Sequence, residues 1–240
     1  MTQLRSLLER IEAGSGPSLG FGSTQSGRLP GMALIARCSG DIEAALAVAG
    51  ESADAVVIFA PGVTPDALPE IGDRIWGAGG APLEPEGIAR WREAGADFTV
   101  SPFATAQVDA IDIANPGMTH GARIPDDVDD RMWRILAGTP LDFLVLDRSA
   151  MTGPWTLADL GQAADAARRT DKYLIVRVGP RPSANELLAL RQAGAVAIVA
   201  EANDHGVEGL AAIKADLMAM PRAQPASRRG GRTGLESAAT

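Results

Sequence analysis

Residues 173–201 read YLIVRVGPRPSANELLALRQAGAVAIVAE and contain the pattern of a strand, a helix and a second strand. The first seven and the last seven residues are apolar runs rich in Val, Ile and Ala, which is typical of short buried strands. Between them, Ser183 and Glu186 have the spacing of a capping box, which marks the start of a helix. Gly194 is placed to end that helix as its C-cap. The stretch therefore predicts a βαβ unit of a parallel sheet.

The same alternation continues along the chain. Strands are predicted over Pro17–Gly22, Ala33–Cys38, Ala55–Ala60, Ile75–Gly79, Asp97–Pro102, Leu141–Asp147, Tyr173–Gly179 and Ala195–Glu201. Helical patterns fill most of the gaps, and Thr156 with Asp159 resembles a second capping box. About eight βα units in 240 residues predict an α/β fold, a closed (β/α)8 barrel. An open, doubly wound sheet is the structural alternative.

Two segments at the start of the chain depart from this regular pattern. Residues 1–16 place Leu4, Leu7, Leu8 and Ile11 on one helical face, so we expect an extra N-terminal helix docked under the barrel. Residues 23–31, STQSGRLPG, are too rich in turn formers for a helix, which predicts one irregular crossover between the first two strands.

Two later segments also stand apart from the barrel body, which we place over residues 17–220. Residues 103–126 are long for a connection and follow a strand, so we expect a lid-like insertion with a hairpin around NPGM. Residues 221–240 lack hydrophobic periodicity and are rich in Gly, Ser, Ala and Arg, which predicts a disordered tail.

Charge and composition limit the partners and the compartment. A formal net charge of −8 disfavours nucleic acid, whose binding depends on Lys and Arg. No apolar run reaches the roughly 18 residues that span a membrane. Cys38 is the single cysteine, and the first ten residues, MTQLRSLLER, lack the apolar stretch of a signal peptide. We therefore expect a cytoplasmic protein without an internal disulfide.

Two arginines interrupt apolar strands near their C-terminal ends, Arg37 and Arg177. Barrel side chains alternate between the interior and the outer face, so both arginines are expected to point into the mouth of the barrel. The same parity sends Asp147 and Glu201 inward. Asp147, Arg177 and Glu201 end three consecutive predicted strands, with Arg37 one strand beyond Glu201.

This arrangement has two interpretations. The first is a structural network of ion pairs that fills the barrel mouth, because buried charges are costly unless paired. The second is an anion-binding mouth in which Asp147 or Glu201 acts as catalytic acid or base. We expect Arg177 to pair with a carboxylate and Arg37 to face the ligand. The candidate substrate-binding residues are Arg37, Arg177, Arg181, Ser101 and His120.

The end of the last predicted strand is a candidate metal site, because Glu201, Asn203, Asp204 and His205 lie close to one another in sequence there. Their oxygen ligands would suit Mg²⁺. The alternative is a polar loop in which Asn203 or Asp204 caps the final helix. We predict no cofactor, with Mg²⁺ kept as the alternative.

The barrel body resembles single-domain bacterial TIM-type barrels, and loosely the phosphate-binding ones among them. That resemblance implies a glycine-rich backbone site for phosphate after the seventh and eighth strands. Here Gly179 is followed by Pro180 and Pro182, which lack backbone donors, so Arg181 would have to supply the contact. We therefore expect a small-molecule enzyme, a lyase or isomerase acting on a phosphorylated or carboxylated anion. A non-catalytic barrel that binds a ligand or a partner is the alternative.

Overall fold

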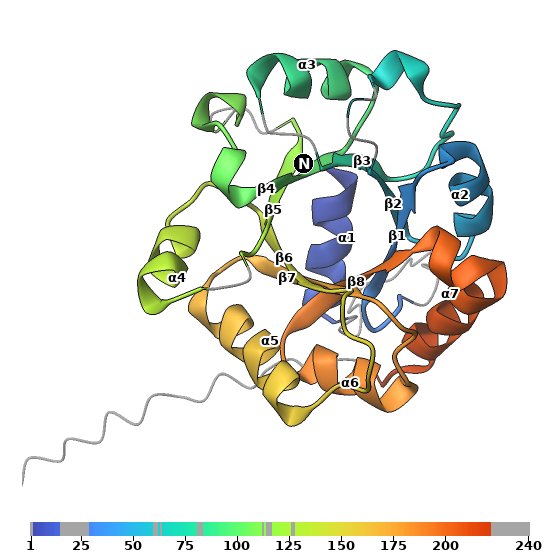
Figure 1. The fold of residues 1–240 in the computed structure, drawn as a ribbon, viewed down its shortest axis with the longest axis vertical. Helices are drawn as coiled ribbons and strands as arrows, with labels where there is room; N and C mark the ends of the chain where they lie inside the picture. The colour runs from blue at the N-terminus through green and yellow to red at the C-terminus, as the bar shows by residue number, and fades with distance from the viewer. Residues whose placement is uncertain are drawn as a thin grey trace, which may run out of the picture.

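A computed structural model describes residues 2–14, 29–59, 62, 64–80, 84–111, 113, 117–125 and 128–221. Its parallel strands pair in chain order and close when β8 pairs with β1, so the barrel prediction is confirmed (Figure 1). The strands are β1 (Ala33–Ser39), β2 (Ala55–Phe59), β3 (Trp76–Gly79), β4 (Phe98–Pro102), β5 (Thr119–Arg123), β6 (Phe143–Arg148), β7 (Tyr173–Val178) and β8 (Ala195–Glu201).

The helices surround the barrel, apart from α1, which lies at one end (Figure 1). They are α1 (Gln3–Glu12), α2 (Ile42–Ala49), α3 (Pro85–Glu93), α4 (Asp130–Ala137), α5 (Leu157–Arg169), α6 (Ala184–Gln192) and α7 (Ala202–Ala219). Complete capping boxes start α5 at Thr156 and α6 at Ser183, as the sequence predicts. Gly194 has a positive φ of 106°, which fits its expected place after α6.

The identity of one strand corrects the sequence analysis. β5 lies inside the predicted insertion over 103–126, and it pairs in parallel with β4 and β6, so the predicted hairpin is wrong. The sequence of β5, THGAR, has no apolar run because one of its inward positions is a glycine and another is an arginine. The predicted strand Pro17–Gly22 lies outside the described residues, and the barrel closes without it.

The irregular connections also differ from the prediction. The segment 23–31 precedes β1, so it is not a crossover of this barrel. Among the described residues, the crossovers without an α-helix are β2 to β3, with the 3₁₀ helix η1 (Pro65–Ala67), and β4 to β5, with η2 (Phe103–Thr105) and η3 (Val108–Ala110). Both connections emerge from the C-terminal ends of strands, the end at which barrel enzymes carry their sites.

Two phenylalanines fill the interior of the barrel below the mouth. Phe98 and Phe143 meet edge to face, with ring centroids 6.2 Å apart. Glycines make room for both rings, because a Cβ on Gly77 would lie 2.5 Å from the Phe98 ring and one on Gly121 would lie 2.1 Å from the Phe143 ring. The interior of the barrel is therefore packed at this level by side chains of the described strands.

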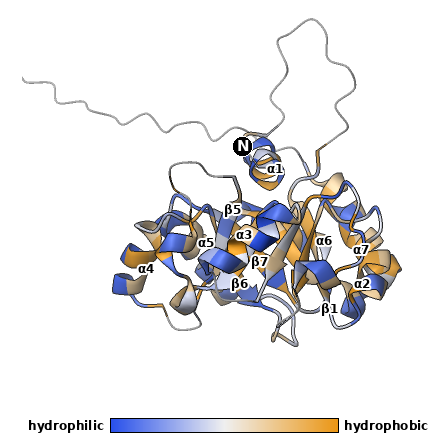
Figure 2. Cartoon of the chain, turned by 90° about the horizontal axis from the view of Figure 1, so that it is seen from above, coloured by the Kyte–Doolittle hydropathy of each residue, from blue (hydrophilic) through white to orange (hydrophobic). Residues whose placement is uncertain are grey.

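Helix α1 covers the N-terminal end of the barrel (Figure 2). The buried face of α1 is made of the apolar residues expected from the sequence, Leu4, Leu7, Leu8 and Ile11. The Asp97 carboxylate, at the start of β4, accepts hydrogen bonds from the backbone N–H groups of Gln3 and Leu4 at 2.8 and 2.7 Å. Asp97 thus satisfies two of the free backbone donors at the start of this helix.

Within the described part of the chain, no helix is long and apolar enough to cross a membrane. The predicted tail over 221–240 lies outside the described residues after Pro221.

Candidate functional site

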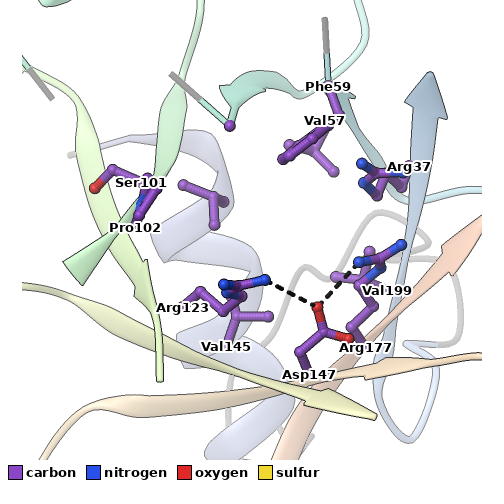
Figure 3. Close-up of a pocket in the computed structure, with 12 residues that line it drawn as sticks. Arg37, Val57, Phe59, Ser101, Pro102, Arg123, Val145, Asp147, Arg177 and Val199 are labelled. Atoms are coloured by element: carbon purple, nitrogen blue, oxygen red, sulfur yellow. Dashed lines mark hydrogen bonds and ion pairs between the residues drawn. The ribbon is translucent and has the colours of Figure 1, made fainter. Parts of the chain in front are cut away.

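A cavity of about 220 Å³ opens at the C-terminal ends of the strands (Figure 3). Every strand of the barrel except β3 contributes to it directly, and the residue that follows β3, Gly80, completes the wall. The lining residues are Arg37, Val57, Phe59, Gly80, Val100, Ser101, Pro102, Arg123, Val145, Asp147, Arg177 and Val199. The charged residues predicted from strand parity are therefore at the mouth, with Glu201 immediately behind the lining.

Strand register brings these charges together. Asp147 of β6 is the register partner of Arg177 on β7, and Arg37 of β1 is the register partner of Glu201 on β8. Neighbouring strands place paired residues side by side on the same face, so each cation stands beside a carboxylate. Of the seven residues predicted for the site, these four share one mouth.

Glu201 holds two of the arginines. Its Oε2 accepts a hydrogen bond from Arg37 and lies 3.7 Å from Nη2 of Arg177. Its Oε1 accepts a hydrogen bond of 2.6 Å from the Ser39 hydroxyl. The side chains of Arg37 and Glu201 are only 13% and 10% exposed, so this pair is largely removed from water. The arrangement fits the structural interpretation for these two residues.

Asp147 is the carboxylate that faces the cavity. Its Oδ2 accepts a hydrogen bond of 3.0 Å from Arg177 and lies 3.8 Å from Arg123 (Figure 3). Its Oδ1 accepts hydrogen bonds from the backbone N–H and the hydroxyl of Ser149. Burial acts to raise the pKa of Asp147, but the bonds from Ser149 and the charge of Arg177 outweigh it, so the pKa is lowered. Asp147 is therefore ionised at neutral pH.

Arg123 is the most accessible charge of the site, and sequence reasoning missed it. Its side chain is 55% exposed, and the Asp147 contact is its ion pair among the described residues. Arg123 ends β5, as Arg37 and Arg177 lie near the ends of their strands, but the sequence pattern predicts a lid-like insertion at this segment. The signal that could have found Arg123 is the one that identified Arg37 and Arg177. It is an arginine near the C-terminal end of a short segment that alternates like a strand.

The opposite wall of the cavity is apolar. Val57 and Phe59 of β2, Gly80, and Val100 and Pro102 of β4 form it. The guanidinium of Arg37 lies 3.8 Å from the centroid of the Phe59 ring, a cation–π contact that joins the apolar wall to the charged one. A Cβ on Gly80 would lie 2.5 Å from that ring, so the glycine lets Phe59 occupy its place.

Two predicted substrate-binding residues, Ser101 and His120, direct their side chains away from the cavity, because neighbouring side chains along a strand point to opposite faces. Ser101 contributes to the lining through its position between Val100 and Pro102, but Figure 3 shows its hydroxyl directed away from the cavity. His120 is buried on the outer face of β5, where its Nδ1 lies 2.9 Å from the Thr99 hydroxyl. The expectation that His120 arrives from a lid is wrong, because it belongs to a barrel strand.

Arg181 also differs from the expectation. Its Nη2 donates a hydrogen bond of 2.9 Å to Asp216 of α7, and it does not line the mouth cavity. Its charge is matched by a carboxylate of a surface helix, so it is not turned toward the mouth. The loop after β7 therefore brings no cation to the cavity.

The acidic residues near the end of β8 do not assemble into a ligand set. Among the described residues, no group of three or more His, Cys, Asp or Glu side chains is arranged to hold a metal ion. Asn203 donates instead to the carbonyl of Ser39 at 2.9 Å, and Glu201 is engaged by arginines. Neither Asn203 nor Asp204 is the N-cap of α7, a position that Glu201 takes.

Comparison with known proteins places the fold. No family model and no curated protein sequence matches this chain. Among solved structures, KGPDC from Streptococcus mutans is similar over 78% of this chain and 97% of its own, with a TM-score of 0.58 and 13% identity. The fold is a TIM barrel. A 3-hexulose-6-phosphate synthase matches over 78% of this chain and 99% of its own, with a TM-score of 0.56 and 20% identity.

A third neighbour is thiamine phosphate pyrophosphorylase from Pyrococcus furiosus, with a TM-score of 0.57 and 12% identity over 78% of this chain and 95% of its own. At these identities the likeness establishes the TIM-barrel architecture and leaves the chemistry to the residues of the mouth.

Proposed function

We propose that this TIM barrel is an enzyme that binds a small anionic metabolite at its mouth and moves a proton on it, as a lyase or an isomerase does. The observation that carries the proposal is the state of Arg123. It is a cavity-lining guanidinium, 55% exposed, whose contact with Asp147 is 3.8 Å long. A half-exposed arginine beside a partly buried carboxylate is suited to receive the anionic group of a ligand.

The charges of the mouth support an anionic ligand. Three arginines and two carboxylates leave a formal excess of one positive charge, because Arg37, Arg123 and Arg177 face only Asp147 and Glu201. Arg123 and Arg177 flank Asp147, so an anion held by Arg123 would lie next to that carboxylate.

Asp147 is the proposed base. It lines the cavity and is ionised at neutral pH, so it starts the reaction as a proton acceptor. The negative charge of an anion bound to Arg123 would lie beside Asp147 and raise the pKa of that carboxylate, which makes it a stronger base. Glu201 does not line the cavity, and we assign it as a positioning residue that holds Arg37 and Arg177 in place.

The names of the structural neighbours agree with an anionic substrate. One is a 3-hexulose-6-phosphate synthase and another is a 3-keto-L-gulonate-6-phosphate decarboxylase from Vibrio cholerae, with 20% and 16% identity. Both names contain a phosphorylated compound. They support an anion-binding TIM-barrel enzyme in general and do not choose the reaction of this chain.

Proton exchange tests this proposal without knowledge of the product. The purified protein would be incubated in D₂O with a panel of small carboxylates and phosphorylated metabolites, and deuterium incorporation would be measured by mass spectrometry. We expect exchange into at least one compound, and its loss in Asp147→Asn. Asp171→Asn is the matched control, because the Asp171 side chain is 82% exposed and outside the mouth.

A non-catalytic binding barrel is the second candidate. Its support is that each carboxylate of the mouth already accepts hydrogen bonds through both oxygens, from arginines and from Ser39 or Ser149. Binding of an anion that depends on Arg123, with no exchange into any compound of the panel, would favour this candidate over the enzyme.

A further inference from the structure

The mouth cavity has two chemically different halves. The strands β5, β6, β7 and β1 contribute the charged side chains, and β2, the residue after β3, and β4 contribute only apolar surface to a ligand (Figure 3). Val145 of β6 and Val199 of β8 add hydrocarbon on the charged side. Within the described lining, the apolar half offers no polar side chain to a ligand, because the Ser101 hydroxyl points away. A ligand that fills the cavity therefore meets arginines at one end and hydrocarbon at the other.

The apolar half consists of hydrocarbon side chains and the backbone of Gly80, so it offers a ligand no side-chain hydroxyl or amide. Sugar hydroxyls are recognised by polar groups, and leaving them against hydrocarbon costs the hydrogen bonds that they make with water.

The number of charges at the anionic end also restricts the ligand. One positive charge in excess balances a monoanion such as a carboxylate. A phosphate monoester carries about −1.5 to −2 at neutral pH, which would add uncompensated negative charge beside Asp147 and Glu201. The charged half is therefore matched to a carboxylate better than to a phosphate.

Backbone N–H groups, the other common phosphate ligands in this fold, are also few in the described part of this mouth. Backbone donors of the loops after the seventh and eighth strands often bind phosphate in TIM barrels. Here Pro180 and Pro182 lack an N–H, and Arg181 is bonded to Asp216. After β8, Asp204 lies in the first turn of α7, where its carboxylate opposes an anion.

We propose that the ligand of this cavity is a small monocarboxylate with an apolar body, and not a sugar phosphate. This inference rests on the proposed function, because it names the substrate class of the same site. The volume sets the size: a cavity of about 150 Å³ holds benzene, so one of about 220 Å³ holds a carboxylate of roughly ten non-hydrogen atoms. Such an acid would put its carboxylate on Arg123 and its apolar body against Val57, Phe59 and Val100.

Isothermal titration calorimetry on the full chain separates the two ligand classes. The probes are phenylacetate, its neutral analogue phenylacetamide, and ribose 5-phosphate. Phenylacetate is expected to bind about tenfold or more tightly than either of the other two, since only it satisfies both halves of the cavity. Arg123→Gln is expected to weaken phenylacetate by about tenfold, the effect of losing a charged hydrogen bond.

A second variant tests the apolar half by itself. Val100→Thr keeps the shape of the side chain and introduces a hydroxyl beside the ligand, so it is expected to weaken phenylacetate by about three- to tenfold. The matched control is Val196→Thr, because Val196 is buried in the same interior core but does not line the cavity. Val57→Thr repeats the test on β2 if the Val100 variant does not fold.

The outcomes distinguish this inference from the proposed function. Tighter binding of phenylacetate that is reduced in both Arg123→Gln and Val100→Thr supports the inference. Tighter binding of ribose 5-phosphate that still requires Arg123 overturns it and leaves the anion-binding enzyme standing. Binding of the anions that is unchanged in Arg123→Gln, or no binding of any probe, overturns both.

Discussion

Arg37 of β1 lies directly opposite Glu201 of β8, across the seam at which the barrel closes. The sequence prediction placed Arg37 one strand farther away, because it counted Pro17–Gly22 as the first strand. The correct strand order makes Arg37 a partner of Glu201. Arg37 lines the cavity and Arg177 pairs with Asp147, but both arginines are paired, so the expected division between a paired Arg177 and an unpaired, ligand-facing Arg37 does not hold. Arg123 is the arginine with the free surface.

Loss of the largely buried Arg37 should destabilise the fold more than loss of the half-exposed Arg123. Arg37→Met leaves the buried Glu201 with the 3.7 Å contact to Arg177 as its remaining ion pair beside the Ser39 hydrogen bond, and we expect it to lower the free energy of unfolding by about 3 kcal/mol. Arg123→Met removes a half-exposed, long ion pair and should cost less than about 1 kcal/mol. Urea unfolding followed by circular dichroism measures both. Equal costs would show that Arg123 is structural, against the proposed role.

Asp147 should stabilise the fold in a pH-dependent manner. Its pKa is lowered in the folded protein, so its contribution is fully present above the ordinary Asp pKa of about 3.9 and is lost as pH falls through the lowered value. The difference in unfolding free energy between wild type and Asp147→Asn should stay constant from about pH 8 to pH 5 and shrink below about pH 4. Asp73→Asn, at an exposed surface position away from the mouth, serves as the reference. A difference that grows in acid would mean that Asp147 is protonated in the folded state.

The two histidines should make the fold less stable in mild acid. Burial lowers the pKa of His120 and of His205, and nearby Asp142 and Asp204 oppose this effect only in part. Both folded values lie below the unfolded pKa of about 6.5, so their contribution is present above that pH and is lost as pH falls through the folded values. We expect the slope of unfolding free energy against pH, between about 7.5 and 5, to decrease in His120→Gln and further in the double variant with His205→Gln. An unchanged slope in the double variant would contradict burial of neutral imidazoles.

The end of the described chain gives a boundary for truncation. Met220 is buried, and its side chain packs against Gly31, while the carbonyl of Pro221 accepts a hydrogen bond from Arg191. The tail after Pro221 shows no core pattern in its sequence, so we predict that removing residues 222–240 leaves the melting temperature nearly unchanged. The matched truncation that also removes Met220 and Pro221 should lower it by several degrees. A large drop on removal of 222–240 alone would show that the tail packs on the body.

The sequence predicted strands with a continuous apolar run and failed where the interior of the barrel is built from a small residue and a charge. β7 and β8 were found because YLIVRV and AVAIVAE contain little else than aliphatic side chains. β5 was missed because its inward positions are Thr119, Gly121 and Arg123, which do not form an apolar run. Their places in the interior are explained only by residues of another strand, Phe143 and Asp147. Asp147 and Arg177 could be placed from parity alone, whereas Arg123 required β5 to be recognised.

Gly121 is therefore the position where the barrel interior should be least tolerant of an added methyl group. A Cβ there would lie 2.1 Å from the ring of Phe143, a packed side chain with no solvent-exposed surface. We expect Gly121→Ala to lower the free energy of unfolding by about 1 to 3 kcal/mol, the usual cost of overpacking a core. Gly161→Ala in α5 is the matched control, because no described atom lies within 4 Å of its added Cβ, and it should stabilise the helix by up to about 1 kcal/mol. Chemical unfolding of the two variants beside wild type decides the matter, and a Gly121→Ala protein as stable as wild type would mean that Phe143 does not occupy the bore beside β5.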